Sequence, residues 1–252
     1  MPAETIDGVI EELTAIIDRT RSEELRTGYF PALYREVTRR VKEGITGERF
    51  DDPDRMERLD VTFANRYLRA VEERRGDGSP TRSWHETFEA AEAWSPLILQ
   101  HLLLGMNAHI NLDLGIAAAE VSEAGRLEDL EDDFREINAI LGAMIDAVQL
   151  RLTAHSPWMG VLDRLGGEAD EVISNFALRA ARDDAWQFAR DLVGVDRERW
   201  PDLIEQKDRV TARRAEEILH PGGWWARPIL LAARFRETAA PSAVIDDLAD
   251  WE

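Results

Sequence analysis

Apolar residues recur every three or four positions along almost the whole chain, which is the spacing of one face of an α-helix. No convincing run alternates strictly between apolar and polar residues, as a half-buried strand would. A short helix is expected to begin at Ser83, and longer helices are predicted over residues 4–21, 31–42, 54–75, 97–122, 127–152, 170–193, 201–219 and 224–237. The expected fold class is all-α, a single-domain multi-helix bundle of about nine or ten helices.

Local signals indicate where two of these helices begin. Ser83 and Glu86 have the spacing of a capping box, in which each side chain bonds a free backbone N–H of the first helical turn. Ser95 followed by Pro96 suits an N-cap and a first-turn proline. We therefore expect the next helix to begin at about Leu97.

The most apolar stretch of the chain is QHLLLGMNAHINLDLG, residues 100–115, and it contains two histidines, two asparagines and an aspartate. A helix that is apolar over most of its circumference is normally buried, so we expect this one to be the central helix of the bundle. Buried polar groups are unfavourable unless they have partners. These five residues should therefore share a site or a hydrogen-bond network.

His109 and Asp113 lie one turn apart on one face of this helix, with His101 further round the same side. Asn107 and Asn111 point almost the opposite way. An imidazole and a carboxylate at this spacing can bind a metal ion, or the carboxylate can orient the imidazole as a general base. A structural role is an equal alternative, in which Asp113 bonds His109 or a neighbouring helix.

Asp60 interrupts an apolar stripe of the 54–75 helix that also contains Tyr67. A buried carboxylate without a partner is unfavourable, so we expect a cationic or metal partner for Asp60. Asn138 and Asp183 also lie beside apolar faces of their predicted helices. An arginine is a more frequent partner for such carboxylates than a metal ion, and the sequence offers Arg66, Arg179 and Arg182.

The candidate site residues fall into three groups. The catalytic candidates are His109, Asp113 and Asp60, the substrate-binding candidates are Asn107, Asn111, His101, Tyr67 and Asn138, and a divalent metal, if one binds, would be held by His109, Asp113 and Asp183.

The length of 252 residues and the 44% hydrophobic content are enough for one sizeable core. We expect one helical domain over residues 1–245. The acidic segment 246–252 is expected to be a frayed tail.

Charge and targeting signals limit the partners. The formal net charge of −19 would repel nucleic acid and anionic membranes. The absence of cysteine excludes disulfides and thiolate metal sites and fits a reducing compartment. The first residues lack the features of a signal peptide, and the apolar run around residues 97–106 is interrupted and too short to span a bilayer. We expect a cytoplasmic protein, with a small molecule as its partner.

Three segments resemble the bacterial DUF5995 family, namely FDDPDRMERLDVTFANRYLRAV, LQHLLLGMNAHINLDLGIAAA and ALRAARDDAW. The resemblance extends from about residue 35 to residue 237. It implies a helical protein of about this length and does not indicate which activity the protein has. The residues that it places in the shared segments are Asp60, Asn65, Arg66, Asn107, His109, Asn111, Asp113 and Asp183.

The chain is also loosely similar to the helical zinc-dependent phospholipase C and nuclease group, in which His and Asp from several helices hold metals. Two departures weaken this similarity. The chain has one H-x-x-x-D helix where that group has several, and it has no counterpart of the group's proline-rich histidine motif.

The sequence leads to three hypotheses. The first is an enzyme, a hydrolase or lyase, that acts on a small and largely apolar molecule by metal-assisted or acid–base chemistry at His109. The second is a non-catalytic protein that binds such a molecule. The third is a structural protein whose buried polar network only specifies helix packing.

Overall fold

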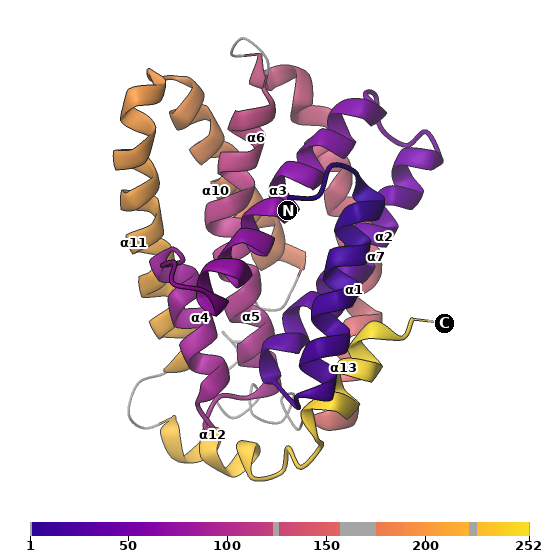
Figure 1. Ribbon diagram of the computed structural model, residues 1–252, viewed down its shortest axis with the longest axis vertical. Helices are drawn as coiled ribbons and strands as arrows, with labels where there is room; N and C mark the ends of the chain where they lie inside the picture. Colours follow the sequence, from indigo (N-terminus) through magenta and orange to yellow (C-terminus); the bar gives the residue numbers. More distant parts are fainter. Residues whose placement is uncertain (1, 123–125, 157–174, 222–225, 252) are drawn as a thin grey trace.

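The computed structural model describes residues 2–122, 126–156, 175–221 and 226–251, and it is helical throughout this part (Figure 1). Ten helices and no strands occur in these ranges when α5 and α6 are counted as one continuous helix. The helices are α1 (Ile6–Ser22), α2 (Tyr29–Thr46), α3 (Pro53–Arg75), α4 (Arg82–Glu92), α5 (Ile98–Ala108), α6 (Gly115–Val121), α7 (Glu131–His155), α10 (Asn175–Val193), α11 (Trp200–Leu219), α12 (Arg227–Arg234) and α13 (Pro241–Ala249). The predicted all-α fold is confirmed.

The continuous helix from α5 to α6 runs through the middle of the molecule (Figure 1). Helices α2, α4 and α11 pack against α5, and helices α3 and α10 pack against α6. Its side chains at Leu112, Ile116 and Ala117 have no exposed surface. The predicted buried central helix is therefore confirmed.

A π-helical segment, His109–Leu114, joins α5 to α6. Its hydrogen bonds link residues five apart, so one extra residue is accommodated in the turn, and such bulges are frequent at functional sites. Every residue of this segment except Ile110 is buried. His109 and Asp113, selected from the sequence, thus both lie within a local irregularity of the central helix.

Two predicted helix starts agree with the structure within one residue, but the caps expected for them are wrong. The first residue of α4 is Arg82, and Ser83 does not form a capping box, because the backbone N–H groups of Arg82 and Ser83 donate to the carboxylate of Asp208 in α11 at 2.8 and 2.9 Å. Helix α5 begins at Ile98, where the Gln100 side chain accepts a hydrogen bond from the N–H of Leu97. Tertiary and side-chain partners thus replace the expected N-caps.

The chain forms a helix, α13, that the sequence analysis did not identify, and this helix extends to Ala249. Its buried residues Val244, Ile245 and Leu248 join a core cluster with residues of α1 and α2. The segment expected to fray from residue 246 is therefore helical over its first four residues. The sequence analysis gave weight to the acidic residues of this segment and did not recognise the helical spacing of Val244, Ile245 and Leu248.

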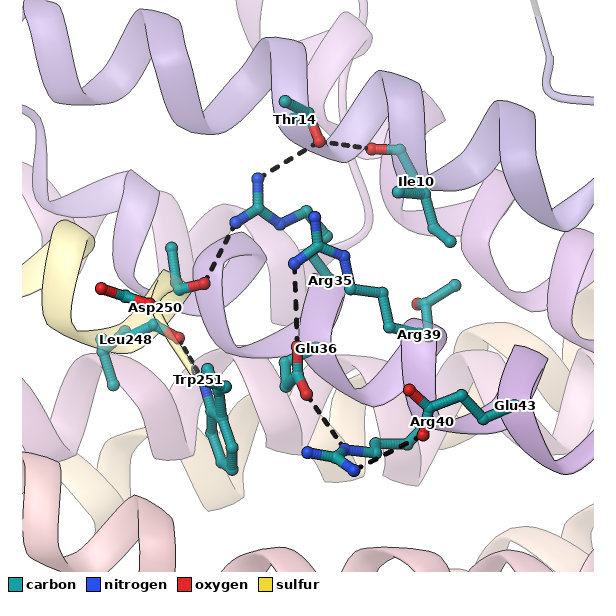
Figure 2. A network of polar contacts seen from close by, with 12 residues as sticks. Ile10, Thr14, Arg35, Glu36, Arg39, Arg40, Glu43, Leu248, Asp250 and Trp251 are labelled. Carbon is teal, nitrogen blue, oxygen red and sulfur yellow. Dashed lines mark hydrogen bonds and ion pairs between the residues drawn. The ribbon is translucent and has the colours of Figure 1, made fainter.

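Arg35 of α2 holds the end of the chain against the bundle (Figure 2). One guanidinium nitrogen, Nη2, donates to the backbone oxygen of Ala249 at 3.2 Å, and Nη1 donates to Thr14 Oγ1 in α1 at 3.3 Å. The indole of Trp251 donates to the carbonyl of Leu248 at 2.8 Å. One side chain thus connects three helices.

Within the described ranges, two helices are long and apolar enough to cross a membrane by length and composition, namely Ile98–Val121 and Leu127–His155. The expectation that the apolar run near residue 97 is too short is corrected by the length of the continuous helix. In the first helix 83% of the most apolar window is buried inside the protein, as is usual for a core helix. In the second helix only 22% of that window is buried.

The close contact between α6 and α10 predicts that Gly115 cannot be enlarged. A Cβ atom there would lie 2.7 Å from the carbonyl oxygen of Ala185 and 2.9 Å from Cδ1 of Phe188. Gly115→Ala should therefore lower the free energy of unfolding by about 1–3 kcal/mol, measured by urea denaturation.

The matched control is Gly8→Ala in α1, where the nearest atom to the new Cβ is 3.5 Å away. That variant should be as stable as the wild type or more stable by up to about 1 kcal/mol. Equal stability of the two variants would contradict the described packing of α6 on α10.

Candidate functional site

The carboxylate of Asp113 is buried in the interior of the bundle and has partners on two other helices. Its Oδ1 accepts from Nε of Arg66 in α3 at 2.9 Å, and its Oδ2 accepts from Nε1 of Trp84 in α4 at 2.8 Å. Nδ1 of His109 lies 3.5 Å from Oδ2. Burial alone would raise the pKa of Asp113, but Arg66, His109 and Trp84 together lower it. Asp113 is therefore ionised and holds α3, α4 and the central helix together.

The imidazole of His109 is enclosed by aromatic rings. It stacks on Phe63 with ring centroids 3.5 Å apart and meets Tyr34 edge-on at 4.6 Å. Burial lowers the pKa of His109 although Asp113 acts in the opposite direction. The ring is thus neutral at physiological pH, and neither ring nitrogen makes a hydrogen bond among the described residues.

A mostly apolar cavity of about 520 Å³ lies beside His109 and is lined by residues of α2, α3, α5, α7, α10 and α11. This volume is in the range of pockets that bind small molecules. The apolar face of α7 contributes a large part of the wall, which explains why so apolar a helix is packed so little into the core. The polar lining residues are Tyr34, Asp60, Gln100, Asn107, His109, Asn111, Gln149, Arg182, Arg214 and Glu217.

Asp60 lines this cavity, and its side chain is buried. Its Oδ2 has no hydrogen-bond partner in the described part of the chain. Burial, assisted by the negative charge of Glu57, raises the pKa of Asp60 to about 7. The cationic or metal partner expected for Asp60 is therefore not found among the described residues, and the carboxyl group can gain or lose a proton near neutral pH.

Tyr34 is a residue of the cavity that the sequence analysis did not select as a candidate. Its ring lines the cavity, and its buried hydroxyl has no hydrogen-bond partner among the described residues. Burial raises its pKa well above the usual value, and the charges of Asp60 and Asp113 act in the same direction. The hydroxyl is thus a neutral donor close to two acids. No sequence signal distinguished it from a packing residue, since it lies on the apolar face of α2.

The predicted asparagines both line the cavity, where they form one chain of hydrogen bonds. Nδ2 of Asn111 donates to Oδ1 of Asn107 at 3.0 Å, and Nδ2 of Asn107 donates to the carbonyl oxygen of Thr211 in α11 at 2.9 Å. Arg214 donates to Oδ1 of Asn111 at 2.9 Å and to Asp184 at the same distance. The asparagines therefore tie the central helix to α11 and, through Arg214, to Asp184 of α10.

Three other substrate-binding candidates do not line this cavity. His101 is buried beside Tyr29 and lines a separate pocket of about 50 Å³. Tyr67 is packed in the core with its ring centroid 6.2 Å from that of His109. Asn138 of α7 is half-buried outside the cavity lining. Helical periodicity indicated the side of each helix but not which neighbouring helix covers it.

The proposed metal ligands do not come together. In the described ranges no group of three or more His, Asp or Glu residues has the geometry to hold a metal ion. Asp183 is exposed on α10, where it interacts electrostatically with Arg135 and Arg182. The oxygens of Asp113 are occupied by Arg66 and Trp84. The arginine partner of Asp113 is thus Arg66, which the sequence analysis had considered as a partner for the carboxylates of Asp60 and Asp183.

The family comparison matches residues 6–221, from the start of α1 beyond the end of α11, to the family described as "Family of unknown function (DUF5995)". The chain belongs to the DUF5995 family. No curated protein and no solved structure matches it. In this DUF5995 protein the matched range includes Asp60 as well as Asp113 and its partners Arg66 and Trp84.

The buried ion pair between Arg66 and Asp113 predicts that this DUF5995 protein loses much of its stability when one partner is removed. Arg66→Met leaves the buried carboxylate of Asp113 without its cation and should lower the free energy of unfolding by about 3–5 kcal/mol. Asp113→Asn keeps an acceptor for Trp84 and should destabilise less than Asp113→Leu. Chemical denaturation measures the free energy of unfolding of all three variants.

Arg69→Met is the control for Arg66→Met, because Arg69 is exposed on the same helix. It should change the stability by no more than about 0.5 kcal/mol. If Arg66→Met and Arg69→Met had the same stability, the Asp113 pair would not hold the helices together.

The raised pKa of Asp60 predicts a pH-dependent stability. Between the ordinary value of 3.8 and about 7, the folded protein keeps a proton that the unfolded chain releases, so rising pH favours unfolding. Asp60→Asn cannot titrate, and its stability relative to the wild type should increase by roughly 3 kcal/mol between pH 5 and pH 8. Urea denaturation at both pH values measures this difference.

The control is Asp54→Asn, since Asp54 is exposed on the same helix. Its stability relative to the wild type should change little between the two pH values. A constant difference for Asp60→Asn would mean that Asp60 is ionised at neutral pH.

Proposed function

We propose that the protein binds a small, largely apolar molecule in the cavity and catalyses its hydrolysis or elimination by acid–base chemistry. The observation that carries the proposal is Asp60, a carboxyl group in the wall of an apolar cavity. It is buried, its Oδ2 has no partner in the described ranges, and its pKa is about 7. A group that titrates near the working pH is the most effective general acid or base. Unpaired polar groups with perturbed pKa values in a pocket are typical of functional sites.

In this proposal Asp60 accepts a proton from the substrate, or from a water that attacks it, and returns a proton to the leaving group. The neutral imidazole of His109 and the hydroxyl of Tyr34 line the same cavity and offer hydrogen bonds to the polar atom of the substrate. Asp113 is a positioning residue, because its contact with His109 restricts the ring and its bonds to Arg66 and Trp84 leave it no free oxygen. The apolar walls exclude bulk water, which strengthens each of these interactions.

The non-catalytic binding protein is the second candidate, and the surroundings of His109 favour it. The imidazole is stacked on Phe63 and enclosed by Tyr34, Phe30 and Trp84. Burial also lowers its pKa, which makes it a weaker base. If Asp60 transfers no proton to a ligand, the cavity serves for storage or transport alone.

The experiment separates turnover from binding. Binding to the cavity is measured as the affinity for the neutral apolar fluorophore N-phenyl-naphthylamine. Hydrolysis and elimination are measured as the conversion of small apolar esters, lactones, epoxides and β-substituted ketones. Asp60→Asn should keep the affinity for the fluorophore and lower kcat on the active substrate at least about a hundredfold. For the wild type, kcat/KM should titrate near pH 7, and for Asp60→Asn this titration should be lost.

Asp54→Asn is again the control and should retain wild-type turnover. A substrate converted equally by the wild type and Asp60→Asn would contradict the assignment of Asp60. Binding of the fluorophore without conversion of any compound in the panel would favour the binding protein.

A further inference from the structure

Besides Asp60, the cavity wall contains a buried arginine, Arg182 of α10. Only 4% of its surface is exposed. Its Nη2 donates to the carbonyl oxygen of Phe134 at 2.5 Å, and its guanidinium lies 4.4 Å from the centre of the Phe134 ring. Its Nε is buried and has no hydrogen-bond partner among the residues that the structure describes. The cation thus retains at least one unused donor at the wall of an apolar cavity.

In the part of the chain that the structure describes, no carboxylate forms an ion pair with Arg182. The adjacent acid, Asp183, is exposed and acts on it only through its charge. Burial lowers the pKa of Arg182 to about 9, so its side chain still carries a positive charge at neutral pH. A buried charge without a counter-ion is strongly unfavourable, and a bound anion would compensate for it.

The other cation in the wall, Arg214, differs from Arg182 in this respect. Its Nη1 lies 2.9 Å from the carboxylate of Asp184, and its side chain is 41% exposed. Lys207 also bonds Asp184, at 3.0 Å. Arg214 therefore has a carboxylate partner within the protein, which it shares with Lys207, whereas Arg182 forms an ion pair with no acid in the described ranges.

We propose that the ligand of this cavity is an amphipathic carboxylate, whose anionic head group binds Arg182 while its apolar body lies against α7. The inference rests on the proposed function and adds the class of ligand. A carboxylate has the geometry and charge that a guanidinium binds best. The wall residues Leu141, Met144, Ile145 and Val148 of α7 offer an apolar surface for the rest of the molecule.

The experiment compares ligands that differ only in the head group. Decanoate, decanol and decyl phosphate are titrated against the full chain by calorimetry, and each is also tested for displacement of N-phenyl-naphthylamine. Decanoate should bind the wild type at least tenfold more tightly than decanol. In Arg182→Met this preference should disappear while the affinity for decanol stays the same, because methionine preserves the apolar volume but removes the charge.

Arg179→Met is the matched control, since Arg179 is exposed one turn earlier on α10. It should retain the wild-type preference for decanoate, which excludes a general effect of lost surface charge. Circular dichroism and thermal unfolding verify that each variant is folded. The comparison of decanoate with decanol on the wild type requires no variant and tests the inference even if Arg182→Met does not fold.

The possible failures are distinguishable. Equal affinity of the wild type for decanoate and decanol, or a preference that survives in Arg182→Met, would overturn the inference and leave the proposed cavity function intact. Tighter binding of decyl phosphate than of decanoate would overturn the carboxylate assignment. If neither the fluorophore nor any of the three compounds bound, the proposed function would fail together with the inference.

Discussion

The buried carboxylate of Asp113 is the group on which the arrangement of the interior depends. A charge in the middle of the bundle is tolerated only with a cation and hydrogen-bond donors around it, and these come from Arg66 and Trp84. The two donors belong to different helices, α3 and α4, so their bonds to one acid fix both helices against the π-helical part of the central helix. The same contacts place Phe63 of α3 against the ring of His109.

Two acids of the interior have opposite properties because their surroundings differ. Asp113 has a cation and an indole donor, and its pKa is lowered. Asp60 has a buried, unpaired oxygen in an apolar cavity wall, and its pKa is raised to about 7. Pairs of titratable groups whose surroundings separate their pKa values are a recurrent property of acid–base sites. This difference between the pKa values of Asp113 and Asp60 is an observation on which the proposed acid–base role of the cavity rests.

The cavity itself results from an incomplete fit between helices. Helix α7 has an apolar face, yet little of its most apolar window is packed in the core, and that face lines the open volume. A core of this size is normally packed without such voids. Two of the polar groups in the wall, Asp60 and Arg182, lie on different helices and each has an atom without a partner among the described residues. An apolar cavity with a few unpaired polar groups is the usual form of a small-molecule site.

Much of the fold was predictable from the sequence because burial of an apolar stripe is a local property of each helix. The all-α class, the buried central helix and most helix ranges followed from it. Helix α13 was missed because its acidic residues masked the apolar spacing of Val244, Ile245 and Leu248. His101 and Asn138 were placed in the site because periodicity indicates a face, but not the helix that covers it.

By itself, the sequence determined that the protein is helical and that His109, Asp113 and Asp60 lie in its interior, since both conclusions depend on spacing along one helix. Only the tertiary structure decided which acid is neutralised, because Arg66 and Trp84 approach Asp113 from distant parts of the chain. It also decided that Tyr34 and Arg182 border a cavity, a property of how helices fit together. Distances between helices are set by packing, and no pattern within a single helix encodes them.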